Sequence, residues 1–240
     1  MSERIFHRTE LLIGQEAMRM LRDSCMVVIG LGGVGSYAAE AIARSGVGRI
    51  ILCDPDRVEA SNINRQLAAL NSTLGELKTE VIGARLRDIN PLLQLSKYPN
   101  RYCEESSTEI LGQEIHFVLD AIDTLPDKIH LIKTCLYRKI PVISSMGTAN
   151  RLDPLLLTIA DIKDSSICPV ARKLRRELRR ENILQGVPVV YSRETPVKTT
   201  YSGETRLGSI SFVPAAAGLL LASYAVKQLI KNTNPPCPHP

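Results

Sequence analysis

The sequence predicts an α/β fold, with a doubly wound, mainly parallel sheet and helices on both of its faces. Apolar runs that are typical of buried strands alternate with amphipathic helical segments along the first 150 residues. A glycine cluster separates the first of these strands from the helix after it, and acidic side chains end two later strands. Together these observations favour a Rossmann-like, nucleotide-binding sheet with a C-terminal extension.

The composition is that of an ordinary globular protein. The 240 residues are 44% hydrophobic and 23% charged, which is enough for one large domain with a substantial core. A formal net charge of +5 permits an acidic partner without requiring one. The six cysteines form no C-x-x-C pair, which argues against a zinc site and against a disulfide framework. Because the chain begins with polar and charged residues, we expect a cytoplasmic protein.

Residues 25–36 carry the clearest nucleotide-binding pattern. An apolar strand leads into Gly30, Gly32 and Gly35, and a helix of small residues follows. In this pattern Gly30 permits a tight turn, Gly32 lets the backbone approach a phosphate, and Gly35 lets strand and helix pack closely. Asp54 ends the next apolar strand, where a ribose-binding carboxylate belongs. An ordinary glycine-rich turn is the alternative interpretation.

The remaining elements continue the alternation. Residues 78–89 predict an amphipathic helix that stops at an Asn-Pro pair, and residues 115–123 predict a buried strand ending in two acids. We expect Asp120 to be structural and Asp123 to be functional, because Asp123 lies at the strand end. Further expected elements are helices over 10–21, 128–138 and 169–181, and strands over 49–53, 94–100, 141–145 and 153–161.

The C-terminal part differs in character. We expect residues 186–203 to form a polar loop near the site. Residues 210–226 are apolar but short for a membrane span, so a helix buried against the sheet or a second subunit is favoured over membrane association. The predicted organisation is a single domain. It has an N-terminal arm and nucleotide-binding core over 1–150, an extension for substrate binding and dimerisation over 151–231, and a disordered tail over 232–240.

The expected helix over 169–181 is strongly basic. It carries six positive side chains against two negative ones, together with an apolar stripe. A solvated face is one interpretation of this charge, and contact with the phosphate backbone of a nucleic acid is the other. The basic residues are Arg172, Lys173, Arg175, Arg176, Arg179 and Arg180.

Several motifs, in order and at matching spacing over the first 150 residues, resemble the ubiquitin-activating-type (ThiF/MoeB-like) adenylating superfamily. The double glycine and the Asn-x-x-Arg-Gln pattern distinguish it from ordinary dehydrogenases. The motifs are Gly30-Leu31-Gly32-Gly33-Val34-Gly35, Asp54-Pro55-Asp56, Ser61-Asn62-Ile63-Asn64-Arg65-Gln66, Lys78 and Ala121-Ile122-Asp123.

Within this superfamily the chain is most similar to the tRNA threonylcarbamoyladenosine dehydratases. The resemblance implies an enzyme that uses ATP to cyclise the threonylcarbamoyl group of a modified adenosine in tRNA, through an adenylated carboxylate. The segments that carry it are Arg8-Thr9-Glu10-Leu11-Leu12-Ile13-Gly14, Ala43-Arg44-Ser45-Gly46-Val47-Gly48, Arg87-Asp88-Ile89-Asn90-Pro91, Leu152-Asp153-Pro154, residues 169–175 and Tyr191-Ser192-Arg193-Glu194.

The resemblance also implies roles for individual residues. Asp54 would bind the ribose hydroxyls, and Asp123 would hold Mg²⁺. Arg8 would reach the phosphates of a neighbouring subunit, so that a homodimer is the working unit. The implied catalytic residues are Arg8, Arg65, Lys78 and Asp123, and the implied nucleotide-binding residues are Gly30, Gly32, Gly33, Gly35, Asp54, Asp56, Asn62, Arg65, Gln66 and Lys78, with the phosphates contacted by Asn62, Arg65 and Lys78.

The implied ligands are ATP and Mg²⁺, and a monovalent cation is left open. The implied partners are tRNA, for which the basic residues 172–180 are the candidate contact, and a second copy of the chain. A sulfur-relay or cysteine-desulfurase-linked protein is a further implied partner, and no zinc is expected.

Other functions are weighed against this one. An enzyme that adenylates the C-terminus of a ubiquitin-like sulfur carrier is the alternative, although such enzymes commonly carry two C-x-x-C zinc pairs and this chain has none. A dinucleotide-dependent oxidoreductase would leave Asn62, Arg65 and Lys78 unused, and a non-catalytic adaptor would not need an intact ATP site. Cys168 is the best-placed residue for a thioester, but a lone cysteine is more often a packing residue.

Overall fold

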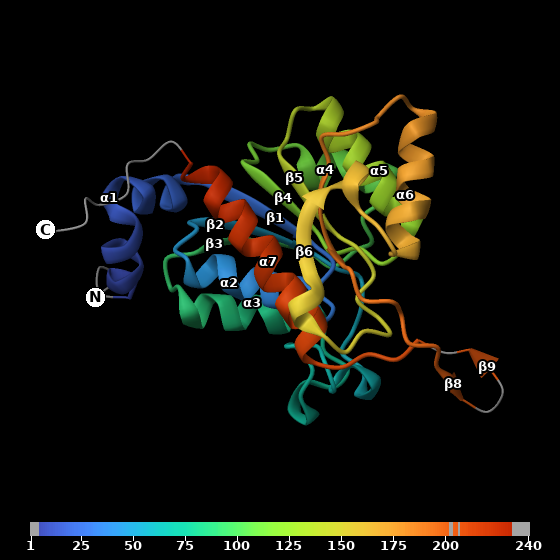
Figure 1. Cartoon of the computed structure of the whole chain (residues 1–240). Helices are drawn as coiled ribbons and strands as arrows, with labels where there is room; N and C mark the ends of the chain where they lie inside the picture. Colours follow the sequence, from blue (N-terminus) through green and yellow to red (C-terminus); the bar gives the residue numbers. More distant parts are fainter. Residues whose placement is uncertain (1–4, 202–203, 206, 232–240) are drawn as a thin grey trace, which may run out of the picture.

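The computed structural model describes residues 5–231 apart from 202, 203 and 206, and within this part of the chain seven strands form one sheet. Their order is β3-β2-β1-β4-β5-β7-β6, and all neighbours are parallel except β6, which is antiparallel to β7. The strands are β1 (Cys25–Ile29), β2 (Arg49–Cys53), β3 (Gln94–Tyr98), β4 (Phe117–Asp120), β5 (Val142–Ser145), β6 (Leu157–Asp161) and β7 (Pro188–Ser192), and a separate hairpin holds β8 (Thr200–Tyr201) and β9 (Glu204–Thr205) (Figure 1).

The chain winds outward from the centre of the sheet in two directions. From β1 it proceeds to β2 and β3, and it then returns to the other side of β1 to form β4 and β5. The winding therefore reverses between β1 and β4, and sheets of this kind bind ligands outside the carboxyl ends of the strands at that point. The doubly wound, mainly parallel sheet that the sequence predicts is confirmed.

Helices cover both faces of the sheet (Figure 1). Side chains alternate along β1, so that Met26 and Val28 enter the apolar cluster under α2, α3 and α7, whereas Val27 and Ile29 enter the cluster under α4 and α5. A third cluster, which includes Val189 of β7, lies under α6. The helices are α1 (His7–Asp23), α2 (Gly35–Arg44), α3 (Lys78–Ile89), α4 (Glu104–Leu111), α5 (Leu125–Tyr137), α6 (Pro169–Arg180) and α7 (Phe212–Leu229).

Two segments differ from the expectation. Residues 188–192 form the strand β7 between β5 and β6, and the prediction of a continuous polar loop over 186–203 was wrong there. Turn residues before and after this short apolar run concealed it in the sequence. The strand expected over 153–161 begins only at Leu157, because residues 154–156 form a 3₁₀ turn that Asp153 caps by accepting a 2.8 Å bond from the Leu155 N–H. The predicted tail over 232–240 lies outside the described residues.

The apolar C-terminal helix α7 packs on α2 and on the sheet. By length and composition alone it could cross a membrane, but Val213, Ala217, Leu221 and Ala225 are buried in the protein. A Cβ at Gly218 would lie 2.2 Å from the carbonyl oxygen of Val34, so only glycine allows this approach. The helix therefore contacts the glycine loop from outside, and one of its sides is buried against α2 and the sheet, as favoured for residues 210–226.

We expect Gly218→Ala to destabilise the fold. Alanine improves helix propensity by about 1 kcal/mol, but its methyl group clashes with the Val34 carbonyl, and overpacking of this kind costs about 1–3 kcal/mol, occasionally more. The net result should be a lower free energy of unfolding, measured by urea denaturation. Lys227→Ala on the exposed side of the same helix is the matched control, and equal stability of both variants would contradict the close contact.

Candidate active site at the carboxyl edge of the sheet

The glycine loop after β1 lies directly against the end of β4. Gly30 has a φ of +87°, and a Cβ there would lie 2.6 Å from the carbonyl oxygen of Ala121. A Cβ at Gly35 would lie 1.7 Å from the carbonyl oxygen of Gly30, so the new helix starts in contact with the turn that precedes it. Only glycine fits these two positions, because a Cβ at either one would clash with a backbone oxygen of the same chain.

Gly32 and Gly33 differ from each other in what surrounds them. At Gly33 a Cβ would lie 3.3 Å from the carbonyl oxygen of Arg65 and 3.2 Å from Pro214, whereas at Gly32 the nearest atom is the Gln66 Nε2, at 3.8 Å. Packing within the chain therefore does not require glycine at position 32. The Gln66 side chain beside it is buried, and its Oε1 has no hydrogen-bond partner. An open backbone position and an unpaired buried oxygen fit a ligand that approaches the loop here.

Asp54 ties the glycine loop to the end of β2. Its carboxylate is buried and accepts bonds from the N–H groups of Leu31 (2.6 Å) and Asp56 (2.8 Å). Lys78, the first residue of α3, places its Nζ 2.7 Å from Asp56 and 4.0 Å from Asp54. Burial raises the pKa of Asp54, while Lys78 and the two N–H bonds oppose the rise. The result is a buried cation and carboxylate side by side at the floor of the site.

The polar segment after β2 places its side chains at the same edge. Asn62 is buried, and its Oδ1 accepts a 3.2 Å bond from the Glu59 N–H. The Nη1 of Arg65 donates to the Ser61 carbonyl and to the Asn64 side chain, at 2.8 Å each. These bonds hold the half-buried Arg65 side chain at the rim, and no hydrogen bond from its other nitrogens to the described residues is formed.

The strand expected over 115–123 is shorter than predicted, because β4 ends at Asp120 and Asp123 lies three residues beyond it. The two acids have separate environments. Asp120 is fully buried and accepts bonds from Lys128 (2.8 Å) and Ser144 (2.6 Å). Asp123 is exposed and makes no hydrogen bond or ion pair with the described residues. Asp120 is therefore buried and paired within the chain, as a residue without direct ligand contact would be, and Asp123 has its carboxylate available for a ligand.

A magnesium ion fits Asp123 only as part of a nucleotide complex. The described residues hold no cluster of three or more Asp, Glu, His or Cys side chains that could bind a metal. Mg²⁺ needs no such cage, since it usually keeps several waters and binds one or two carboxylates together with substrate phosphates. A single free carboxylate beside the glycine loop suits that arrangement.

Arg8 is the one predicted site residue that its own chain does not bring to the site. The ring of Phe6, two residues earlier, lies 3.5 Å from where a Cβ at Gly46 would be, in the turn that precedes β2. That turn is at the amino edge of the sheet, and a five-residue strand separates the two edges by about 17 Å. Figure 1 accordingly shows α1 at the side of the molecule remote from the loop after β2.

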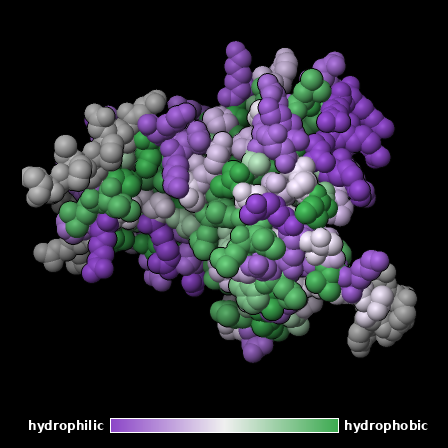
Figure 2. Space-filling view, in the orientation of Figure 1, coloured by the Kyte–Doolittle hydropathy of each residue, from purple (hydrophilic) through white to green (hydrophobic). Residues whose placement is uncertain are grey.

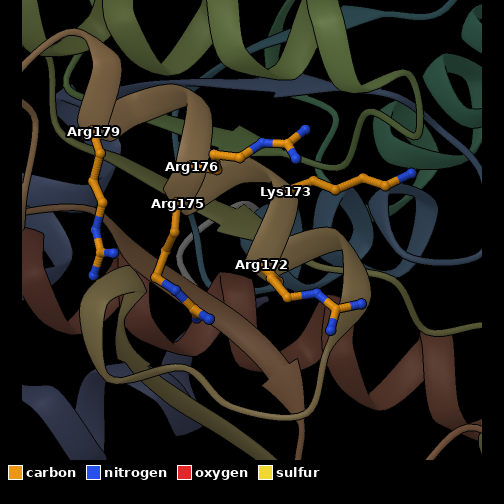
Figure 3. A pocket seen from close by; sticks show the side chains of 5 residues that line it. All are labelled: Arg172, Lys173, Arg175, Arg176 and Arg179. Carbon is orange, nitrogen blue, oxygen red and sulfur yellow. The ribbon is translucent and has the colours of Figure 1, made fainter.

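The basic helix α6 forms as predicted and presents its charge outward. A hollow of about 570 Å³ beside it is lined by Arg172, Lys173, Arg175, Arg176 and Arg179 (Figure 3). Figure 2 shows this part of the surface as hydrophilic. Arg175 bends back and donates hydrogen bonds to Ser165 and Ile162, so its guanidinium group is engaged within the chain.

The other cations of α6 differ in how far they are neutralised. Glu177 pairs with Arg176 (3.3 Å) and Arg180 (2.6 Å). Arg172, Lys173 and Arg179 are exposed and have no acidic partner among the described residues. A Cβ at Gly147, just after β5, would lie 3.1 Å from Val170, so the helix begins at the carboxyl edge of the sheet.

Cys168 is buried at the start of α6, in the apolar cluster with Met146 and Leu174. No other described sulfur lies within disulfide distance, and the thiol is closed to solvent. The packing interpretation of this cysteine therefore fits the structure better than a thioester role.

Sequence reasoning missed two groups near Asp123. Lys128 is buried on α5 between Asp120 and Ser144. Arg101, after β3, bonds Asp127 at 2.6 Å; burial alone would raise the pKa of Asp127, but the bonds from Arg101 and Thr124 outweigh it and lower that pKa. A lysine eight residues after a strand-end acid, within an apolar helix, was the only signal in the sequence.

Comparison with known proteins agrees with this geometry. Residues 6–239 match the ThiF family. The chain is 44% identical to the tRNA threonylcarbamoyladenosine dehydratase of Bacillus subtilis, over 95% of each chain, and 32% identical to that of Escherichia coli, over 94% of this chain and 93% of the relative. The solved structure of the E. coli dehydratase TcdA in complex with ATP superposes with a TM-score of 0.88 at 33% identity, covering 95% of both chains. This chain belongs to the ThiF family.

Proposed function

We propose that this protein is an ATP-dependent tRNA threonylcarbamoyladenosine dehydratase, which cyclises the modified adenosine through an adenylated carboxylate. The observation that carries the proposal is the convergence of the glycine loop, Asp54, Lys78 and Asp123 at the reversal point of the sheet. Similarity to dehydratases of this name extends over the whole sheet, including the extension that holds β6 and β7. An oxidoreductase would have no use for the cations at this edge.

The proposed reaction has two steps. The threonyl carboxylate attacks the α-phosphorus of ATP, which forms an acyl adenylate and releases pyrophosphate. The carbamoyl group then closes on the activated carbonyl, and AMP leaves with one of the former carboxylate oxygens. The loss of water from the base is thereby coupled to the conversion of ATP to AMP and pyrophosphate.

The residues of the site meet the electrostatic demands of the first step. Two anions must approach each other, and cations placed beforehand lower the cost of the developing charge. Lys78 is fixed by Asp54 and Asp56, and Arg65 is fixed by the backbone of Ser61, so neither must reorganise when the nucleotide binds. Mg²⁺ held by Asp123 would neutralise the phosphates and assist the departure of pyrophosphate.

The proposed working unit is a homodimer. Arg8 lies at the opposite edge of the sheet from its own site, so its proposed role is on the site of a second copy. Exposed apolar side chains on α1 (Leu11, Leu12) and α7 (Phe212, Leu219) supply a surface that a second copy would cover. The hydrophobic residues visible over the lower part of α7 in Figure 2 belong to this face.

The proposed contact for the tRNA is the free charge of α6. Arg172 and Arg179 lie seven residues apart on one exposed stripe, close to the separation of two helical turns, and both lack acidic partners. We place the protein in the cytoplasm, where its tRNA substrate is. A sulfur-relay protein and a monovalent cation stay predictions of the family resemblance.

AMP release is the direct test of the function. We expect AMP formation, and loss of one water from the nucleoside, with tRNA that carries threonylcarbamoyladenosine and not with unmodified tRNA. Arg65→Gln should lower kcat by about 100-fold or more, because a cation near the transferring phosphoryl group is lost. Nucleoside mass analysis and AMP chromatography provide the two readouts.

Arg57→Gln is the matched control for this test, because Arg57 lies in the same loop and also donates to a backbone carbonyl, that of Gly75. It should leave kcat near the wild-type value. ATP–pyrophosphate exchange that appears only with a small carrier protein would instead establish the sulfur-carrier alternative.

Mixing two inactive variants tests the role of Arg8. Arg8→Ala and Asp123→Ala should each abolish activity, and a mixture that exchanges subunits should recover about a quarter of it, since one site of each heterodimer is intact. AMP release after mixing is the measurement. If Arg8 served its own chain, or served only the fold, the mixture would stay inactive.

Salt dependence tests the role of α6. The double variant Arg172→Gln/Arg179→Gln should bind tRNA more weakly and reduce the slope of log K against log salt concentration by about 1.5, the value for two lost phosphate contacts. Arg87→Gln/Arg138→Gln removes two exposed charges elsewhere and is the control. Equal slopes for the two double variants would contradict a specific role of this helix.

A further inference from the structure

We propose that Lys128, Asp120 and Ser144 form a positioning unit that holds Asp123 in place for the metal-bound nucleotide. The inference rests on the proposed role of Asp123 as the Mg²⁺ ligand and assigns a task to three buried residues that do not touch the ligand. Lys128 is the centre of the unit, because both other residues bond its ammonium group.

The unit is a closed network at the ends of two strands. The Nζ of Lys128 donates to Asp120 Oδ2 at 2.8 Å and to the Ser144 hydroxyl at 3.2 Å, and the same hydroxyl donates to Asp120 Oδ2 at 2.6 Å. Asp120 and Ser144 are fully buried, and Lys128 is 2% exposed. Salt in the solvent does not screen an ion pair enclosed to this degree.

Hydrogen bonds to Asp120 and from the first turn of α5 fix the backbone on both sides of Asp123. One residue before it, the Ile122 N–H donates to Asp120 Oδ1 at 3.0 Å. One residue after it, the Thr124 carbonyl accepts a 3.1 Å bond from the backbone N–H of Lys128, which is the first backbone bond of α5, the helix that carries the ammonium group. Asp123 itself is exposed and makes no bond, so its position is set by these two neighbours.

The placement of the segment depends on the same network. Ala121, between Asp120 and Ile122, is the residue whose carbonyl oxygen approaches Gly30. The bond from the Ile122 N–H to Asp120 therefore also fixes the backbone segment that contacts the glycine loop, immediately before Asp123. A carboxylate on a free loop would have to be ordered by each incoming nucleotide, at a cost in affinity that this arrangement avoids.

Stability alone does not explain the network. A buried ion pair is costly to desolvate, and apolar residues of similar volume commonly stabilise a core as well or better. Residues behind a metal ligand that fix its orientation, by contrast, are worth about 10–100-fold in metal affinity. The pair is joined to the residue before Asp123 through the Ile122 N–H and to the helix that begins just after Asp123, which favours this second role.

The test uses Mn²⁺ as the probe and the full-length protein. Four variants are compared with the wild type: Lys128→Met, Ser144→Ala, Asp123→Asn and Ile132→Ala. Ile132 is fully buried one turn after Lys128 on α5, so its truncation is a matched control for a damaged core. Three quantities are measured: the melting temperature, the affinity for ATP without metal, and the Mn²⁺ affinity of the ATP complex by electron paramagnetic resonance.

We expect Lys128→Met to lower the Mn²⁺ affinity of the ATP complex by about tenfold or more. Asp123→Asn, which removes the proposed ligand itself, should lower the same affinity. The affinity of Lys128→Met for metal-free ATP should stay within about twofold of the wild type, because the glycine loop is intact. Ser144→Ala keeps the ion pair between Lys128 and Asp120, so its loss of Mn²⁺ affinity should be smaller than that of Lys128→Met. Ile132→Ala should melt earlier but bind Mn²⁺ normally.

Two results would overturn the inference, and they are distinguishable. If Asp123→Asn loses Mn²⁺ while folded Lys128→Met and Ser144→Ala retain it, the network is structural and the proposed function stands. If Asp123→Asn also retains Mn²⁺, the metal role of Asp123 is wrong and the inference falls with it. Where Lys128→Met does not fold, Ser144→Ala decides, and unchanged Mn²⁺ affinity in that variant contradicts the proposal.

Discussion

The close approach of Gly30 to Ala121 is the constraint on which the rest of the structure depends. It joins the end of β1 to the end of β4 at the point where the winding reverses, and no side chain could occupy the gap. With the two strand ends in contact, Asp54 reaches the glycine loop from one side and Asp123 stands beside it on the other. Parallel pairing of the central strands thus determines where the site lies, and the side chains supply its ligand-binding groups.

The carboxylates of Asp54, Asp120 and Asp123, which surround this contact, differ in their environments and in their bonding partners. Asp54 satisfies backbone N–H groups and holds the loop, whereas Asp120 neutralises a buried lysine and holds the end of β4. Asp123 has no such duty within the described residues, which leaves its charge for a ligand. Burial of the first two and exposure of the third leave Asp123 as the one of these three carboxylates that makes no hydrogen bond to the described residues.

The sequence predicted those features whose cause is local. Gly30 and Gly35 could be identified because the turn and the helix start impose spacing on adjacent residues, and Asp54 because it ends a strand. The role of Lys128 could not be foreseen, since its partner Ser144 comes from another strand and only the fold brings them together. For the same reason β7 was overlooked, because its identity as a strand depends on its neighbours β5 and β6. Nor could the sequence show which cations of α6 are bonded within the chain and which are free, because the bonds of Arg175 to Ser165 arise from tertiary packing.

The position of α7 has a consequence for synthesis of the protein on the ribosome. This helix is the last element among the described residues, yet it covers the apolar face to which Leu119, Ile143 and Val190 contribute. Each of the seven described strands of the sheet is therefore translated before the helix that shields one of its faces, and the nascent chain carries an open hydrophobic surface until α7 has been made. Such a chain is exposed to aggregation during that interval, so we expect truncation within α7 to be more damaging to yield than its distance from the site suggests.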